Sequence, residues 1–287
     1  FTSSNGGYNW SWLPIEFENF NYVQGFGVLN NDTLLLLYRE ESKGMAIARS
    51  TDSGKNWTRG TSLNIDPYKG EAGADANKFC QLPDGSVIVT VSLKEDHVYH
   101  STNGGQTWDE RNILLEDSFE SNFLSLGENN VLAVIRRQRL ENNEPPGAWQ
   151  KTGSDGQLIN KVLFLANSND GGRTWTNERQ LTKLHGDCPG ELIRLSDGRI
   201  VVLYCHRYPY GHGNTTALVS NDNGITWSQE RYIVSIGCGY SGSVVLADDT
   251  IVTVCGNTQL NELAPDNGIG HNAEPWQAHS VRWRLPG

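Results

Sequence analysis

The chain has 287 residues and a mass of 31.8 kDa, a length that suits one large domain or two small ones. It contains 31 Gly and 9 Trp but a single Met, a composition that favours a mostly β fold over a helical one. The net charge of −10 disfavours binding to nucleic acid. No apolar run approaches the roughly 18 residues of a membrane-spanning helix, so we expect no membrane segment.

A short segment recurs five times along the chain, and we call it a box. Its pattern is Ser-x-Asp/Asn-x-Gly-x-Thr/Asn-Trp, and the copies start at residues 3, 50, 101, 168 and 220, that is, 47, 51, 67 and 52 residues apart. These intervals match the length of one four-stranded propeller blade. The Asp or Asn can bond nearby backbone N–H groups, the Gly can adopt positive φ, and the Trp can cover an apolar seam. Each box is therefore predicted to form a rigid turn.

A polar pair followed by an apolar run predicts a hairpin in every unit. The five pairs lie at residues 31–32, 84–85, 129–130, 197–198 and 248–249. In the first unit we predict strands at 24–29, 33–38 and 45–49, and an outer strand that starts near Trp57; the later units follow the same order.

The two ends of the chain predict a closed ring. The last unit, residues 241–283, ends after its third strand, whereas the chain begins with a box and a strand at 12–17. We predict that this N-terminal strand pairs with the C-terminal blade, residues 241–284, because a ring closed in this way leaves no sheet edge unpaired. Residues 1–287 are then a single domain.

The boxes resemble those of the Asp-box proteins in the sialidase (neuraminidase) superfamily. The five copies cover the whole chain, and the resemblance implies an all-β, sialidase-like β-propeller. The repeats predict five four-stranded blades, with six blades, the usual number in sialidases, as the alternative. Asp boxes also occur in lectins, lyases and receptors, so they point to the fold more than to the chemistry.

Three arginines are predicted to lie on one rim of the propeller. Aligned on their hairpins, Arg39 and Arg137 share a position on the second strand, and Arg207 comes two residues later, on the same side of its strand. Arginine holds a carboxylate through two parallel N–H groups. Sialidases grip the carboxylate of their substrate with an arginine triad, and the resemblance implies that role here. The alternative is surface ion pairs with neighbours such as Glu40 or Glu41.

Candidate catalytic residues precede the first strands of units four and five. Residues 239–242, Gly-Tyr-Ser-Gly, resemble the nucleophile segment of sialidases, which implies that Tyr240 attacks the anomeric carbon. A phenol nucleophile needs a carboxylate to take its proton, and Glu191 lies at the matching end of the neighbouring blade. The alternative interpretation is that Tyr240 is a core residue with a satisfied hydroxyl.

The remaining proton transfers need an acid and a base. The family uses an Asp on a loop over the site as the acid, and the resemblance implies Asp75, with Asp187 and Glu71 as alternatives. His206, next to Arg207, is a candidate for a neutral base.

Two insertions are expected to supply substrate contacts, because long loops on a rigid scaffold often carry binding residues. They span about 138–160 in unit three and 257–277 in unit five. Aromatic faces stack on sugar rings. We therefore predict substrate contacts from Trp149 in the first insertion and from His271 and Trp276 in the second.

Five cysteines cannot all pair within one chain. We expect Cys80 to be the free one and the other four to pair, either as Cys188–Cys205 with Cys238–Cys255 or across the two blades. The Cys and His spacings show no zinc pattern, and we predict neither a metal nor a cofactor.

The chain starts at Phe1 and contains four Asn-x-Ser/Thr sequons. They begin at Asn9, Asn31, Asn56 and Asn214. Both features are typical of a secreted, extracellular glycoprotein.

Together these features favour a secreted, retaining exo-glycoside hydrolase that cleaves a terminal sugar bearing a carboxylate, with an oligo- or polysaccharide as its partner and a monomeric state. One alternative is a polysaccharide lyase acting on uronate-containing glycans, in which His206 and Tyr240 transfer the proton. The other is a non-catalytic carbohydrate-binding propeller. The side chains at equivalent rim positions are dissimilar, which favours one site over a multivalent lectin.

Overall fold

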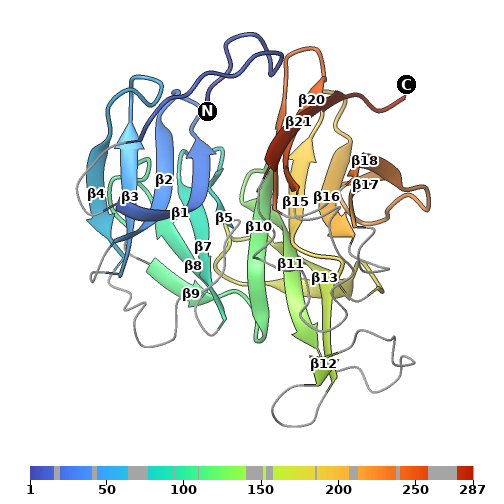
Figure 1. Cartoon of the computed structure of the whole chain (residues 1–287). Helices are drawn as coiled ribbons and strands as arrows, with labels where there is room; N and C mark the ends of the chain where they lie inside the picture. Colours follow the sequence, from blue (N-terminus) through green and yellow to red (C-terminus); the bar gives the residue numbers. More distant parts are fainter. Residues whose placement is uncertain are drawn as a thin grey trace. The chain divides into compact units, whose positions relative to one another are not determined.

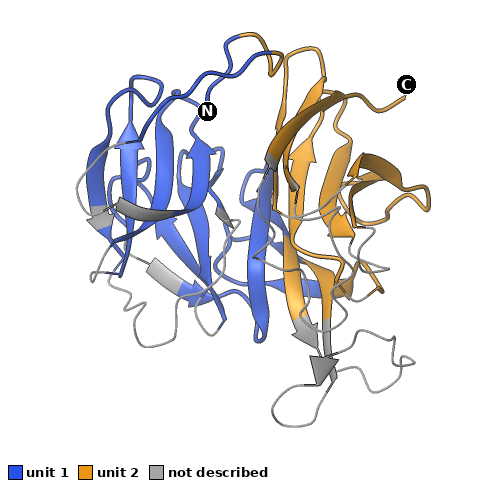
Figure 2. Cartoon of the chain, viewed as in Figure 1, with its two compact units in different colours: residues 1–4, 9–133, 166–178 blue, residues 5–8, 134–165, 179–287 orange. Residues whose placement is uncertain are grey.

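A computed structural model shows an all-β chain, and every regular element in its described part is a strand (Figure 1). The described residues are 1–15, 20–40, 44–63, 77–92, 95–108, 110–139, 151–152, 158–184, 186–206, 213–236, 240–257 and 277–286. Within them, no helix is long and apolar enough to cross a membrane. The chain divides into two compact units (Figure 2): unit 1 comprises residues 1–4, 9–133 and 166–178, and unit 2 comprises residues 5–8, 134–165 and 179–287.

The first sheet lies in unit 1 and has the strands predicted for the first repeat. Its antiparallel strands are β1 (Phe20–Val28), β2 (Leu34–Glu40), β3 (Gly44–Ser50) and β4 (Thr58–Ser62), in the order β4-β3-β2-β1. A two-residue strand, β5 (Asn77–Lys78), runs parallel to β1. The predicted boundaries agree with these strands to within four residues.

The second sheet also lies in unit 1. It contains β6 (Cys80–Gln81), β7 (Val87–Ser92), β8 (Asp96–Ser101) and β9 (Glu110–Ile113) in sequence order. Its inner face packs on that of the first sheet, where Leu35 and Leu37 share one apolar cluster with Val87 and Val89. This shared core buries the apolar faces of both blades.

The third sheet has strands whose residue ranges run from one unit into the other. It contains β10 (Ser118–Gly127), β11 (Asn130–Arg139), β12 (Lys151–Thr152), β13 (Leu158–Ser168) and β14 (Thr176–Gln180). The strand order is β10-β11-β13-β12, and β14 also pairs with β13.

Unit 2 holds the last two sheets. The fourth contains β15 (Gly190–Arg194), β16 (Ile200–His206), β17 (Asn214–Ser220) and β18 (Tyr232–Ile236) in sequence order. The fifth contains β19 (Ser241–Val245), β20 (Ile251–Asn257) and β21 (Gln277–Trp283), which are its three described strands. The five antiparallel blades confirm the predicted fold class, an all-β propeller of five blades.

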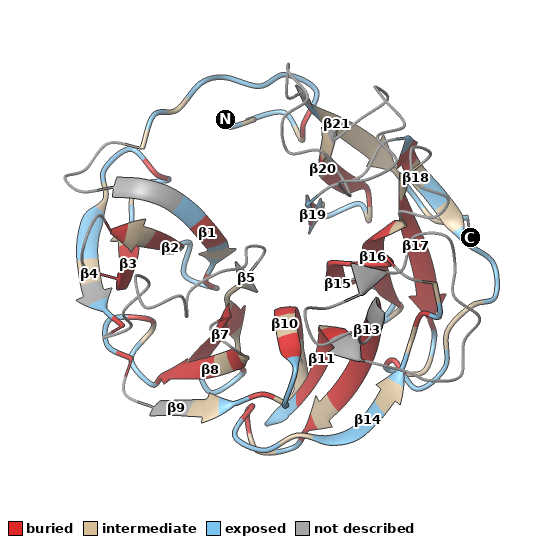
Figure 3. Ribbon diagram, turned by 60° about the horizontal axis from the view of Figure 1, so that its bottom comes forward, coloured by how far each residue is buried: buried red, intermediate tan, exposed pale blue. Residues whose placement is uncertain are grey.

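Burial varies regularly across the blades (Figure 3). The second strands β2, β7 and β16 are buried along nearly their whole length, whereas the outer strand β14 is mostly exposed. The apolar runs that predicted these second strands are therefore the central layer of each sheet.

Four of the boxes share one hydrogen-bond pattern. In the box that starts at Ser220, the N–H of Gly224 donates to Ser220 Oγ at 2.8 Å, Ser220 Oγ donates to Asp222 Oδ1 at 2.8 Å, and the N–H of Thr226 donates to the same Oδ1 at 2.8 Å. The boxes that start at 50, 101 and 168 repeat these bonds. Gly224 has a φ of 81°, so the predicted rigid turn is confirmed.

Residues 5–8 of the first box pack on the fifth sheet within unit 2. A Cβ on Gly6 would lie 2.9 Å from Leu246 Cδ1, and the guanidinium of Arg282 lies 3.9 Å from the centre of the Tyr8 ring. In the predicted strand at 12–17, residues 12–15 are described and form no strand, and residues 16–17 lie outside the described part. The closure of the ring by this strand stays a prediction.

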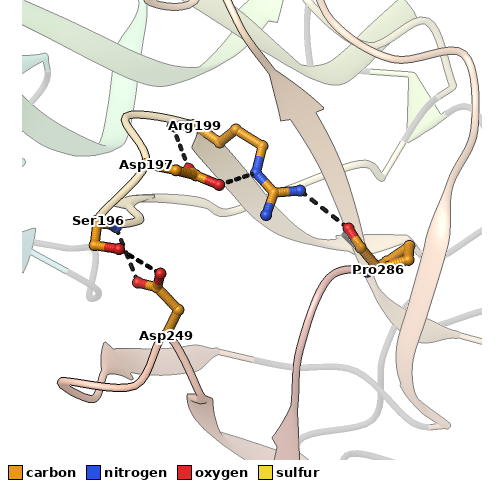
Figure 4. Close-up of polar contacts among 5 residues, drawn as sticks. All are labelled: Ser196, Asp197, Arg199, Asp249 and Pro286. Carbon is orange, nitrogen blue, oxygen red and sulfur yellow. Dashed lines mark hydrogen bonds and ion pairs between the residues drawn. The ribbon is translucent and has the colours of Figure 1, made fainter.

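Side-chain bonds also tie two hairpins of unit 2 together (Figure 4). Ser196 donates to the carboxylate of Asp249 from its N–H at 2.9 Å and from its hydroxyl at 2.5 Å. Arg199 donates to Asp197 at 2.6 Å and to the carbonyl of Pro286 at 3.2 Å. These bonds hold the ends of β15 and β19 that lie away from the predicted catalytic residues.

Candidate active site

The turn before β15 is held in place by the main chain on two sides. The N–H of Gly186 donates to Lys161 O in β13 at 2.8 Å, and the N–H of Cys188 donates to Cys205 O in β16 at 3.0 Å. Gly190 then brings the strand close to β11, because a Cβ there would lie 2.7 Å from Val134 Cγ2. Asp187 lies between the hydrogen-bonded residues Gly186 and Cys188, so the position of its backbone is fixed.

Asp187 and His206 form the best-defined polar pair among the predicted residues. Asp187 Oδ1 lies 2.5 Å from His206 Nδ1; the Asp187 side chain is fully buried, and that of His206 is 14% exposed. An ionised carboxylate only accepts hydrogen bonds, so Nδ1 carries a proton and Nε2 of the neutral ring is an acceptor. The structure thus gives His206 an oriented ring, and it places Asp187 as the partner of that ring.

Tyr204 completes this cluster, although it is not among the residues predicted from the sequence. It lies two residues before His206 on β16, so both side chains are on the same face of the strand. Burial and the negative charge of Asp187 raise the pKa of Tyr204 above its ordinary value, against a smaller opposing effect of Arg231. Tyr204 Oη and Asp187 Oδ2 are buried and have no hydrogen-bond partner among the described residues. The signal in the sequence was the spacing of two between Tyr204 and His206.

Glu191 connects the first strands of the fourth and fifth blades. It is 4% exposed, and its Oε1 accepts a hydrogen bond from the N–H of Ser243 in β19 at 2.8 Å. Ser243 is held in turn, with its Oγ 3.0 Å from Thr253 Oγ1 in β20. The predicted base therefore lies against the strand that follows the predicted nucleophile.

Tyr240 directly precedes β19 and is 40% exposed. Its carbonyl accepts a hydrogen bond from the N–H of Gly256 at 3.4 Å, which fixes its backbone beside β20. A tyrosine with this exposure is not a core residue, so the alternative interpretation of Tyr240 is wrong. The hydrogen bond between its hydroxyl and Glu191 stays a prediction.

The predicted arginine triad is only partly described. Arg137 on β11 is 4% exposed, and its guanidinium carbon lies 5.6 Å from the centre of the Phe164 ring, a cation–π contact. Arg39 on β2 pairs with Met45 of β3 and belongs to unit 1. Arg207 lies outside the described residues, and the convergence of the three arginines stays a prediction.

The alternative partner of the arginines, Glu40, has other contacts. Its carboxylate accepts hydrogen bonds from Arg59 Nε at 2.5 Å and Nη2 at 2.8 Å, and from Tyr38 Oη at 3.0 Å. A bidentate arginine and a phenol therefore hold this buried carboxylate. Six other predicted residues lie outside the described part: Glu41, Glu71, Asp75, Trp149, His271 and Trp276.

The cysteines depart from the predicted pairing. Cys80, Cys188 and Cys255 are buried thiols, whereas Cys205 is in a disulfide. The expectation for Cys80 is confirmed, but the expectation that the other four cysteines all pair is wrong, because Cys188 and Cys255 are thiols; the pairs Cys188–Cys205 and Cys238–Cys255 do not form. Cys255 Sγ instead accepts a hydrogen bond from Thr215 Oγ1 at 3.5 Å, and Cys238 lies outside the described residues. Among the described residues, no group of His, Cys, Asp and Glu could hold a metal ion.

The repeated blades and the polar residues at the starts of β15 and β19 define a repeat-built β-propeller with a candidate active site in unit 2. Residues 29–252 match the family model of the BNR repeat-like domain. The chain belongs to this family.

Known proteins resemble the chain in sequence and in structure. It is 24% identical over 178 residues to a protein named sialidase from Paraclostridium sordellii, and this match covers 51% of the chain and 43% of that protein. A protein of unknown function from Dyadobacter fermentans has a TM-score of 0.59 at 15% identity, covering 86% of this chain and 78% of that one. An α-L-arabinanase from Penicillium chrysogenum, solved with arabinobiose, has a TM-score of 0.58 at 16% identity, covering 84% and 77%. These structural likenesses show the fold.

Proposed function

We propose that the protein is a secreted, extracellular glycoside hydrolase that cleaves a terminal sugar carrying a carboxylate, with retention of configuration. The observation that carries the proposal is the position of Tyr240, exposed at the start of β19, where the Glu191 carboxylate already binds the N–H of Ser243. A sequence relative named sialidase supports the same class of reaction.

The chemistry suits these residue types. A neutral phenol attacks an anomeric carbon beside a carboxylate without the charge repulsion that an Asp or Glu nucleophile would meet. Glu191 takes the phenolic proton as the bond from Tyr240 to the sugar forms. Arg137 supplies a fixed positive charge for the substrate's carboxylate, the role predicted for it together with Arg39 and Arg207.

A fluorogenic assay tests the substrate class. The wild-type protein should release the fluorophore from a 4-methylumbelliferyl α-glycoside of N-acetylneuraminic acid and leave neutral α-L-arabinofuranosides intact. Release from the neutral sugar alone would contradict the proposal.

The nucleophile is tested by Tyr240→Phe, with Tyr8→Phe as the matched control on a tyrosine that is 71% exposed. Tyr240→Phe should abolish turnover while substrate binding and the melting temperature stay unchanged, because an exposed hydroxyl contributes little to folding. Full activity in Tyr240→Phe would rule out a tyrosine nucleophile.

One observation favours a second candidate, a polysaccharide lyase. Asp187 holds His206 in the tautomer that leaves Nε2 as a base, which suits abstraction of the proton beside a uronate carboxylate. Elimination leaves an unsaturated uronate that absorbs in the ultraviolet, whereas hydrolysis does not. Ultraviolet absorbance on a panel of uronate-containing polysaccharides therefore separates the two reactions, and binding without either product would indicate a carbohydrate-binding propeller.

A further inference from the structure

We propose that His206, in place of the predicted acid Asp75, donates a proton to the glycosidic oxygen and later accepts one from the attacking water, and that Asp187 and Tyr204 position it for this role. The proposal rests on the glycoside hydrolase function proposed above. One cluster in unit 2 carries it, formed by β16 and the turn that leads into β15.

Asp187 restricts proton exchange to one atom of His206. Its carboxylate is fully buried and lies 2.5 Å from Nδ1, and the main chain on both sides of it is bonded to β13 and β16. The carboxylate therefore accepts Nδ1–H whether the ring is neutral or charged, and only Nε2 gains and loses a proton. This is the arrangement that a buried carboxylate gives to a catalytic histidine in other hydrolases.

The exposure of its side chain identifies His206 as the member of the cluster that can react with a substrate. Asp187 and Tyr204 are 0% exposed, whereas the His206 side chain is 14% exposed, so His206 is the member that a substrate can reach. Tyr204 stays protonated, because burial and the charge of Asp187 raise its pKa, with Arg231 acting in the opposite direction. Tyr204 is therefore a donor and not a competing base.

The buried atoms without partners indicate a place for a hydroxyl group. Tyr204 Oη offers a donor and Asp187 Oδ2 offers an acceptor, and neither has a hydrogen-bond partner among the described residues. Tyr204 lies on β16 and Asp187 in the turn before β15, and the charge of Asp187 acts on the phenol. Because both atoms are buried, the hydroxyl that accepts from the phenol and donates to the carboxylate is that of an enclosed water and not that of the substrate.

The two steps balance in protons and electrons. In the first, Nε2–H of the imidazolium protonates the glycosidic oxygen, the anomeric carbon–oxygen bond breaks with its electron pair going to that oxygen, and Tyr240 forms the new bond while Glu191 takes the phenolic proton. In the second, water attacks the anomeric carbon and passes a proton to Nε2. The bond to Tyr240 breaks as the water attacks, its electron pair returns to the phenolic oxygen, and the phenolate recovers its proton from Glu191.

The leaving group provides the kinetic test. His206→Gln should lose about 100-fold or more in kcat/KM on a substrate whose leaving group is a sugar, and much less on a 4-nitrophenyl glycoside, which needs little protonation. Asp75→Asn is the matched comparison and should show no such difference between the two substrates. A leaving-group dependence in Asp75→Asn but not in His206→Gln would overturn the proposal.

A spectroscopic test needs no turnover, so it separates this proposal from the proposed function. Nitrogen-15 NMR should show the neutral His206 as the Nδ1–H tautomer in the wild type, and Asp187→Asn and Asp187→Ala should remove that preference. His100, whose Nε2 lies 2.9 Å from Asn112 Oδ1, serves as the unchanged reference. An Nε2–H tautomer in the wild type would overturn the proposal. If the tautomer is as expected and no acidic sugar is hydrolysed, only the proposed function fails.

Discussion

Glu191 of β15 accepts a hydrogen bond from the main-chain N–H of Ser243 in β19, so one carboxylate joins the first strands of two neighbouring blades. The same carboxylate is the proposed base for Tyr240. Its structural and chemical roles use different properties, because the bond to Ser243 needs an acceptor oxygen and the base needs a negative charge.

Variants of Glu191 separate these two roles. Glu191→Ala should lower the free energy of unfolding by about 1–3 kcal/mol, because the buried N–H of Ser243 loses its acceptor. Glu191→Gln keeps an acceptor oxygen and should retain most of the stability while losing turnover. Urea unfolding and steady-state kinetics measure both effects. Wild-type turnover in Glu191→Gln would contradict the base role, and wild-type stability in Glu191→Ala would contradict the structural one.

Gly190 is expected to tolerate no side chain. A Cβ there would lie 2.7 Å from Val134 Cγ2 and 3.0 Å from Leu163 Cδ1, so Gly190→Ala should cost about 1–3 kcal/mol of stability through overpacking. Gly242 occupies a similar place in β19 with no heavy atom within 4 Å of such a Cβ. Gly242→Ala is the matched control, and its effect should stay within about 0.5 kcal/mol. Equal urea midpoints for the two variants would contradict the close packing of β15 on β11.

The aspartates of the boxes should make the protein less stable in acid, because their pKa values are lowered in the folded state. Hydrogen bonds from Asn56 and from Thr226 lower the pKa values of Asp52 and Asp222 from the ordinary value of 3.8 to about 2. Because the folded-state pKa is the lower one, this stability is fully present above about pH 4 and is lost as the pH falls towards 2. The double variant Asp52→Asn, Asp222→Asn should be less stable at neutral pH and should show a smaller fall in urea midpoint across this range.

The box that starts at residue 101 allows the reverse substitution, from a neutral side chain to a titratable one. Asn103 makes the same bond to the N–H of Thr107, at 2.9 Å, without a titratable group. Asn103→Asp should therefore steepen the fall in urea midpoint between about pH 4 and 2. An unchanged acid profile in both variants would show that the boxes do not contribute to acid stability.

The buried carboxylate of Asp96 should change the pH dependence of stability in the opposite direction. Its carboxylate is fully buried and accepts hydrogen bonds from the hydroxyls of Ser92 and Ser121. Burial raises its pKa to about 6 despite these bonds, and the charge of Glu120 adds to the increase. The folded state then holds a proton that the unfolded chain releases above about pH 4, so stability falls as the pH rises from about 4 to 6.

The variant Asp96→Asn should remove this fall in stability. The measurement is the urea midpoint between about pH 4 and 7, with the neighbouring Glu95→Gln as the control. A wild-type slope in Asp96→Asn would show that the carboxylate is ionised throughout this range.

Chemical labelling can test which cysteines are thiols and which is in a disulfide. Alkylation after denaturation without reductant should label Cys80, Cys188 and Cys255 and leave Cys205 unlabelled. Reduction should lower the free energy of unfolding by about 2–4 kcal/mol, because the disulfide constrains the unfolded chain. Peptide mapping identifies the labelled cysteines, and urea unfolding measures the change in stability. A bridge that contains Cys188 or Cys255 would contradict the structure.

The repeat and the order of strands in a blade follow from local sequence patterns. A box closes its hydrogen bonds within eight residues, as from Ser220 to Trp227, so the side chains that build the turn are visible in the pattern. The strands follow from the alternation of apolar residues next to each polar hairpin, and their boundaries were predicted to within a few residues in the first blade. These features are local, and local interactions depend little on how the blades pack.

The contacts among the side chains of the site depend on the packing of the blades. Asp187 and His206 are 19 residues apart and come into contact because the turn before β15 bonds to the end of β16. Glu191 reaches Ser243 across 52 residues, because β19 packs beside β15. The predicted pairs Cys188–Cys205 and Cys238–Cys255 do not form, since Cys188 and Cys255 are buried thiols and Cys255 Sγ faces Thr215 of the neighbouring blade. The direction of a side chain between two sheets is set by the packing of whole blades, and no short segment of the sequence contains it.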